Sequence, residues 1–178
     1  MTSVDWLLIF LGAGIVIFMT FARLVRGVFA VVAVWSTTLM AAALYREAAF
    51  RMQALAGDNL ILFRGIVFAA LVVILFVVGL ILTWVAFPVT KLPKLGLLDN
   101  LGGLLLGAVV AVVLVSLINN SLGLMVIERW NVNEDGWLRL RTMYYASQIR
   151  PYTMDVLRIY RWLFVPFFDG LPPALVPY

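Results

Sequence analysis

Long apolar runs, separated by short charged stretches, dominate the chain. Residues 6–45 are almost continuously apolar, which at 1.5 Å per residue is about twice the thickness of a bilayer core. Arg23 and Arg26 interrupt this run, and keeping both charges at the bilayer centre would cost on the order of 5 to 7 kcal/mol. The pattern therefore predicts a tight hairpin of two helices, residues 6–23 and 27–46. The residues assigned to its turn are Arg23, Arg26 and Gly27.

Two further apolar stretches are each long enough to cross a bilayer. The first, residues 60–87, carries Arg64 near its start and then no charge for 26 residues. The second, residues 97–118, has Asp99 as its only charge, at the first turn. A carboxylate there accepts free backbone N–H groups and meets the positive end of the helix dipole. The predicted fold class is therefore an all-α membrane protein with four transmembrane helices.

The C-terminal part of the chain has a different composition. Residues 129–178 contain six Arg, no Lys, 11 of the 24 aromatic residues and five of the seven prolines. This composition predicts two amphipathic helices at the membrane interface, about residues 136–149 and 152–165. The chain is thus divided into a four-helix transmembrane domain, residues 1–121, and an interfacial tail, residues 122–178.

Overall composition supports a membrane protein and excludes several chemistries. Hydrophobic residues make up 65% of the chain and charged residues 12%, against about a quarter in soluble domains. The absence of Cys and His excludes disulfides, thiolate chemistry and imidazole catalysis. The net charge of +4 fits membrane orientation and lipid headgroups better than nucleic acid. We expect the lipid bilayer and other membrane subunits as partners, with no nucleic acid and no cofactor.

Small residues recur four positions apart on the predicted spans. Such spacing lets helices approach backbone to backbone in lipid. The positions are Ala33, Thr37 and Ala41, then Gly65 and Ala69, then Gly103 and Gly107. Because the spacing recurs on several helices, we expect Gly103 and Gly107 to pack inside the bundle, with homodimerisation as the alternative. The Thr37 hydroxyl is expected to bond a helix backbone, the alternative being that it lines a neutral path.

Asp5 and Asp99 are the main candidates for chemistry because each stands at the start of a predicted helix. One hypothesis is that both cap their helices near the interface and stay ionised. The other is that the two helix starts meet, so that the carboxylates pair with Arg23, Arg26 or Lys94 or bind a cation. Proton-coupled transport usually places an ionisable group near the midplane, and these predicted spans lack one there.

Three side chains of the second tail helix are candidates for contact with lipid headgroups or a partner. They are Arg158, Arg161 and Trp162. Arginines on one side of a helix whose other side is apolar are typical of a helix half sunk in headgroups. We expect interfacial snorkelling, with recognition of a specific anionic lipid as the alternative.

Short motifs in the first 120 residues resemble the colicin V production protein family of bacterial membrane proteins. The matching motifs are Val4-Asp5-Trp6, Arg23 to Arg26-Gly27, and Leu98-Asp99-Asn100-Leu101-Gly102-Gly103 through Gly107. The chain departs from the family at residues 108–110, where relatives often have an Arg-Gly pair. The resemblance implies a four-helix protein of the bacterial inner membrane. Its relatives are associated with colicin V export, with tolerance of envelope stress and, in some chains, with anchoring a protease outside the cytoplasm.

Two questions stay open from the sequence. With the N-terminus inside, nine basic residues collect on the cytoplasmic side against four outside, so charge favours an internal N-terminus. Relatives with an external protease domain imply the reverse orientation. For function, the many packing surfaces favour a non-enzymatic scaffold or accessory subunit of a membrane assembly. The alternative is a component of export or small-solute transport.

Overall fold

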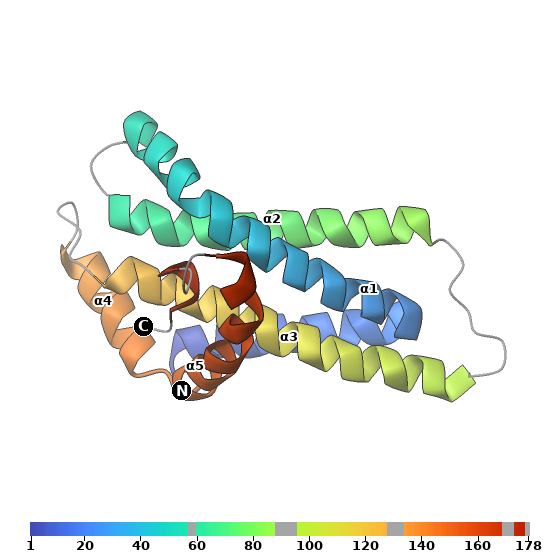
Figure 1. The fold of residues 1–178 in the computed structure, drawn as a ribbon. Helices are drawn as coiled ribbons and strands as arrows, with labels where there is room; N and C mark the ends of the chain where they lie inside the picture. The colour runs from blue at the N-terminus through green and yellow to red at the C-terminus, as the bar shows by residue number, and fades with distance from the viewer. Residues whose placement is uncertain (57–59, 88–95, 128–133, 169–172, 177–178) are drawn as a thin grey trace.

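The structure, a computed structural model, is helical throughout its regular elements. It describes residues 1–56, 60–87, 96–127, 134–168 and 173–176. The α-helices are α1 (Ser3–Ala56), α2 (Leu60–Ala86), α3 (Gly96–Val126), α4 (Glu134–Tyr145) and α5 (Arg150–Tyr160) (Figure 1). Two 3₁₀ helices follow, η1 (Arg161–Phe167) and η2 (Pro173–Leu175). The all-α class predicted from the apolar pattern is confirmed.

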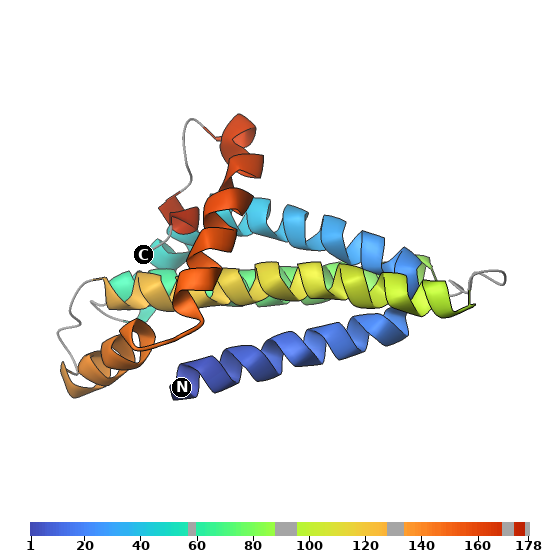
Figure 2. The ribbon, with the colours of Figure 1, turned by 90° about the horizontal axis from the view of Figure 1, so that it is seen from below.

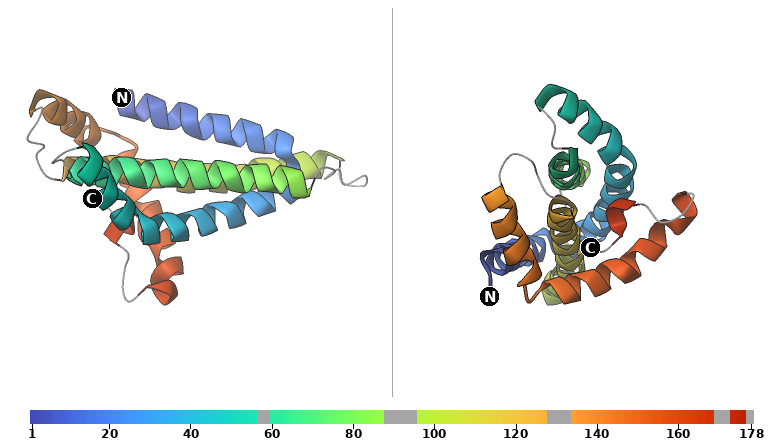
Figure 3. Two further views of the ribbon diagram at one scale, coloured as in Figure 1. Left: turned by 90° about the horizontal axis from the view of Figure 1, so that it is seen from above. Right: turned by 90° about the vertical axis from the view of Figure 1, so that its left-hand side faces the viewer.

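Among the described residues, three helices, α1, α2 and α3, are long and apolar enough to cross a membrane. The 54-residue α1 is bent back on itself at Arg23, whose φ of 69° and ψ of 176° are not helical. Its two segments, residues 3–22 and 24–56, run in opposite directions from this kink (Figure 2). The two segments of α1, with α2 and α3, form an elongated bundle in which α3 is central (Figure 3).

The turn of the hairpin is narrower than the sequence suggested. The chain reverses at Arg23 alone, and both Arg26 and Gly27 already lie in the helix that follows. Gly27 instead faces α3, because a Cβ built there would lie 3.1 Å from the Leu106 side chain. Assigning Gly27 to the turn was therefore wrong: its small size serves helix packing.

The bundle has two distinct ends. The end that holds Arg23, Ala86 and Gly96 is called the kink end, and the end that holds Ser3 and Val126 is called the tail end (Figure 1). At the tail end, α4 lies beside the start of α1, and α5 with η1 runs across α3 rather than along it (Figure 2). The core between the ends is filled by large buried side chains, among them Met19, Phe68, Val110, Leu117 and Leu157.

Several helix boundaries differ from the predicted ones. Helix α1 continues to Ala56, beyond residue 46, where the second helix of the hairpin was predicted to end. Helix α3 ends at Val126 rather than near residue 118, and the predicted division after residue 121 falls inside it. In this extension the polar residues Asn119, Asn120 and Ser121 are buried, and their side chains donate hydrogen bonds to Thr153, Ala174 and Ile118. In the tail, α4 and α5 are shorter than predicted, and η1 continues α5 to Phe167.

Candidate functional site

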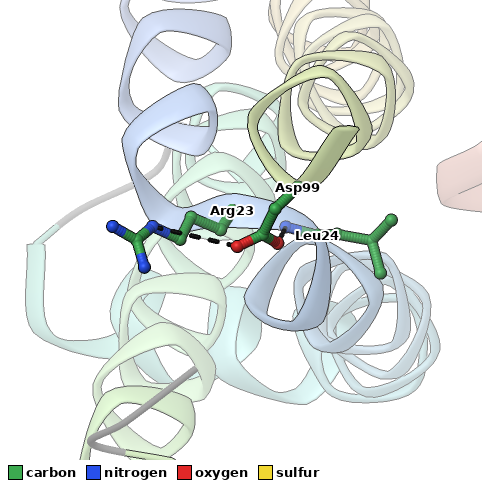
Figure 4. A network of polar contacts seen from close by, with 3 residues as sticks. All are labelled: Arg23, Leu24 and Asp99. Atoms are coloured by element: carbon green, nitrogen blue, oxygen red, sulfur yellow. Dashed lines mark hydrogen bonds and ion pairs between the residues drawn. The ribbon is translucent and has the colours of Figure 1, made fainter. Parts of the chain in front are cut away.

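Asp99 forms a buried polar contact with the hairpin at the kink end. Its side chain lies in the first turn of α3, and the residue is only 3% exposed. Asp99 Oδ1 accepts the backbone N–H of Leu24 at 3.1 Å, and Oδ2 lies 4.0 Å from Arg23 Nε (Figure 4). The Leu24 N–H begins a helical segment and has no partner within it. Asp99 therefore caps the second segment of α1, 75 positions away in the sequence.

The same contact holds a strained residue. The φ and ψ of Arg23 lie in a region of backbone conformation that is essentially restricted to glycine. Occupying such a region costs about 1–3 kcal/mol and persists only where surrounding contacts enforce it. Here the Asp99 carboxylate meets both the backbone after Arg23 and the guanidinium of Arg23 itself. We call Arg23, Leu24 and Asp99 the kink lock.

Two of the predicted small residues bring α3 close to this lock. A Cβ at Gly103 would lie 2.7 Å from the carbonyl oxygen of Met19 and 2.9 Å from Arg23 Cα. A Cβ at Gly107 would lie 2.5 Å from Met19 Cβ. Both glycines thus face α1 of the same chain, where any side chain would collide with the neighbouring helix. Their spacing lets α3 reach the kink.

Arg26, the second hairpin arginine, contacts a different helix. Its Nη2 donates to the Phe87 carbonyl oxygen at 3.0 Å. Its guanidinium carbon lies 3.8 Å from the centre of the Trp84 ring, a cation–π distance. The two arginines that predicted the turn therefore join the hairpin to two helices, Arg23 to α3 and Arg26 to the end of α2.

Asp5 occupies the opposite end of the molecule and is fully buried. Its Oδ1 accepts the Ser147 hydroxyl and the Ile149 N–H, the latter at 3.3 Å. Its Oδ2 accepts the Thr2 N–H at 2.7 Å and the Thr2 hydroxyl at 3.2 Å. We call Thr2, Asp5, Ser147 and Ile149 the tail lock, because they join the N-terminus to the link between α4 and α5. The two helix starts do not meet, which excludes the hypothesis of one shared carboxylate site.

Further hydrogen bonds fix the tail across the bundle. Asn119 Nδ2 donates to Thr153 Oγ1 at 2.7 Å, and Asn120 Nδ2 donates to the Ala174 carbonyl oxygen at 2.7 Å. Sequence reasoning missed these contacts, although adjacent asparagines after an apolar run were a visible signal. Buried amide donors in a helix need partners, and here both Nδ2 groups donate to oxygen atoms of the tail.

The far end of the tail is attached to the second segment of α1. The Tyr160 hydroxyl lies 3.1 Å from Thr38 Oγ1. Since Thr38 already donates to the Val34 carbonyl oxygen at 2.7 Å, Tyr160 is the donor of this bond. Trp35 stacks on Phe164 with ring centres 6.1 Å apart and meets the edge of Phe167. Polar and aromatic contacts therefore hold α5 and η1 in place.

The remaining predicted packing positions lie between helices or are partly covered. A Cβ at Gly79 would meet Ala33 Cβ at 3.1 Å, so Ala33 contacts α2. Gly65 faces the end of α3, since its Cβ would approach Met125 and the Ser121 carbonyl oxygen. Ala41 and Thr37 are buried, and Ala69 is half-buried.

The three candidate contact residues of the tail differ in exposure. Arg158 is exposed and pairs with Asp155 at 3.4 Å, and Trp162 is 63% exposed. Arg161 is half-buried, and its Nε is buried without a hydrogen-bond partner. Of these three residues, only Arg161 therefore combines partial burial with an unused donor.

The two locks show what the acidic residues of the spans do in this fold. Each carboxylate accepts backbone N–H groups from a distant segment, so each acts as a structural acceptor. In the part of the chain that the structure describes, no group of three or more acidic, His or Cys side chains is placed to hold a metal ion. No protein-family model, curated protein or solved structure matches this chain.

Proposed function

We propose that this chain is a non-enzymatic scaffold or accessory subunit of a bacterial membrane assembly, of the kind that its resemblance to colicin V production proteins implies. The strongest support is the use of the two buried carboxylates. Asp5 and Asp99 both hold distant backbone segments together, so the acids of the spans serve the architecture. The result is a rigid bundle with an aromatic tail fixed across it.

We further propose that the two segments of α1, with α2 and α3, make four membrane crossings. Asp99 and Asn119 are 20 positions apart on α3, which corresponds to about 30 Å, the thickness of a hydrocarbon core. Asp99 lies with the hairpin arginines at the kink end, and Asn119 contacts Thr153 at the level of α5. On this proposal, one membrane boundary lies at the kink lock and the other at the level of α5.

The distribution of arginines supports an orientation. Among the described residues, eight arginines lie toward the tail end and two at the kink end. The tail-end set is Arg46, Arg51, Arg64, Arg139, Arg141, Arg150, Arg158 and Arg161. By the positive-inside rule, the tail end faces the cytoplasm and the kink end faces outward.

The absence of cysteine makes this orientation directly testable. Glu47→Cys introduces a thiol at the tail end, and Leu97→Cys introduces one at the kink end; both positions are exposed. In spheroplasts, whose inner membrane is intact and accessible from outside, a membrane-impermeant maleimide should label Leu97→Cys and not Glu47→Cys. The reverse pattern would establish the orientation that the protease-bearing relatives imply.

The scaffold role predicts that a partner binds the face of α5 and η1 that points away from the bundle. Trp162 is a large exposed aromatic beside the exposed Arg158, a pairing that is common in protein interfaces. After mild detergent extraction of tagged protein, mass spectrometry should find a stoichiometric partner. Trp162→Ala should reduce its recovery about tenfold or more. Trp6→Ala is the matched control, since Trp6 is also exposed but lies on α1.

Recovery of the chain alone, or only with copies of itself, would contradict the scaffold role. The transport alternative would then be tested by solute flux into liposomes that contain the purified chain. Flux abolished by Asp5→Asn or Asp99→Asn would make these carboxylates part of a pathway. If neither variant lost flux, the kink lock and the tail lock would be structural contacts only.

A further inference from the structure

Apolar grooves lie between α5 and the bundle, on the kink-end side of the contact between Asn119 and Thr153. Two of them, of about 470 and 340 Å³, adjoin because they share Val109, Val113, Tyr160 and Leu163. We call this joined space the shelf groove. Its other lining residues are apolar side chains of α1, α3 and α5. Its size falls within the range of about 300–1,000 Å³ that is usual for small-molecule sites.

The faces of α5 relate the groove to the membrane. Val156, Ile159 and Leu163 line the shelf groove, and Leu157 and Phe164 are buried against the bundle. With 100° of rotation per residue in α5, Arg150 and Arg158 fall on the edge opposite Val156 and Ile159. Arg161 begins the 3₁₀ helix η1, where the rotation is about 120° per residue, directly after the groove residue Tyr160. One apolar edge and one arginine edge are what a helix at the membrane interface presents.

The geometry points to a bound anionic phospholipid, and we propose that its acyl chains occupy the shelf groove while its phosphate meets Arg161. The Tyr160 hydroxyl, which lines the groove together with the indole of Trp35, is already bonded to Thr38. Arg161 adjoins Tyr160 and has a buried Nε with no partner, a donor suited to a phosphate oxygen. An apolar groove beside an unused arginine donor matches the two parts of such a lipid.

A lipid fits this groove better than a helix of another protein. A transmembrane helix is about 10 Å wide and continues through the bilayer, whereas α5 lies across α3 (Figure 2) and supplies Val156 and Ile159 to the groove lining. An acyl chain begins at the interface and runs only inward, so α5 is no obstacle to it. The proposal concerns the inner edge of α5 and does not depend on a partner protein at Trp162.

Photolabelling provides the test. The full-length protein is reconstituted into phosphatidylcholine vesicles with phosphatidylglycerol that carries a photoreactive group in one acyl chain. Cross-linked peptides should come from α3 around Val109 and from α5 around Leu163. Excess unlabelled phosphatidylglycerol should compete, and added phosphatidylcholine should not.

Matched variants separate a built site from the surrounding lipid. Val109→Trp fills the shelf groove and should lower labelling there about tenfold, whereas Val77→Trp, on a similarly exposed face of α2, should leave it unchanged. Leu163→Trp fills the groove from the other side and is expected to act like Val109→Trp. Arg161→Gln should remove the preference for the anionic lipid, and Arg139→Gln, at an exposed position of α4, should not.

Two outcomes would overturn the proposal. In the first, α3 and α5 are labelled no more strongly than the exposed face of α2, and neither Trp variant changes the labelling. The groove would then contact only the ordinary lipid that surrounds the protein. Equal competition by phosphatidylcholine, with no effect of Arg161→Gln, would remove the assignment of the phosphate to Arg161. Thermal melting of each variant in detergent confirms that a loss of labelling is not a loss of folding.

Discussion

The kink end and the tail end of the bundle each depend on one buried aspartate at a helix start, but the two aspartates hold different things. Asp99 caps the backbone after a strained turn and so fixes the hairpin around which the bundle is built. Asp5 ties the N-terminus to the link before α5 and so fixes an appendage. Breaking the kink lock should therefore destabilise the whole fold, and breaking the tail lock should release only the tail.

The largest expected effect comes from closing the space between α3 and the kink. Gly103→Ala places a methyl group within 3 Å of backbone atoms of Met19 and Arg23, which cannot move independently. We expect a loss of about 3 kcal/mol or more, because overpacking against backbone forces the helices apart. Thermal unfolding in detergent, followed by circular dichroism, measures it. Gly14→Ala is the control, since a Cβ there meets nothing within 4 Å; equal melting of the two variants would contradict the close packing.

Removing each carboxylate tests the comparison directly. Asp99→Ala leaves the partly buried Leu24 N–H without its acceptor, and we expect a loss of about 2–3 kcal/mol in global stability. Asp5→Ala should change global unfolding little and instead speed proteolysis within residues 134–168. The surface substitution Asp155→Ala is the control for both readouts. If Asp5→Ala lowered global stability as much as Asp99→Ala, the two ends would form one cooperative unit.

The strain at Arg23 allows a test in which glycine should be more stable than alanine, the reverse of their usual order in a helix. Its positive φ favours glycine, so Arg23→Gly should be more stable than Arg23→Ala by about 1–3 kcal/mol. In an ordinary helical position glycine would instead be less stable than alanine by about 1 kcal/mol. Both variants lack the guanidinium near Asp99, so the difference in their stability reports the backbone conformation alone. Equal stability, or a more stable alanine variant, would show that the kink does not require this backbone conformation.

The smallest expected effect concerns the hydrogen bond between Tyr160 and Thr38. Tyr160→Phe should weaken attachment of the tail by about 1 kcal/mol, measured by the rate of local proteolysis, while Tyr152→Phe at an exposed position should not. Burial raises the pKa of Tyr160 from 10.0 to about 12. The contribution of the protonated hydroxyl to stability is therefore fully present below pH 10 and is lost as the pH rises through about 12. The assignment would be contradicted if protection of the tail from proteolysis already decreased at pH values below 9 and Tyr160→Phe abolished that decrease.

The sequence by itself determined the class of protein and the approximate place of the hairpin. Apolar length and the cost of burying Arg23 and Arg26 act locally, so they can be read without knowing any partner. The same holds for the spacing of Gly103 and Gly107, which marks a face for close packing, although it does not say against what.

Only the tertiary structure decided which groups meet. Asp5 and Asp99 look alike in sequence, yet their acceptor oxygens serve segments 144 and 75 positions away. The narrowing of the turn to Arg23, from the predicted Arg23, Arg26 and Gly27, and the extension of α3 through Asn119 likewise depend on distant contacts. A local pattern encodes periodicity and the cost of desolvation, whereas the partner of a buried polar group is set by which backbone donors the packed helices bring within reach.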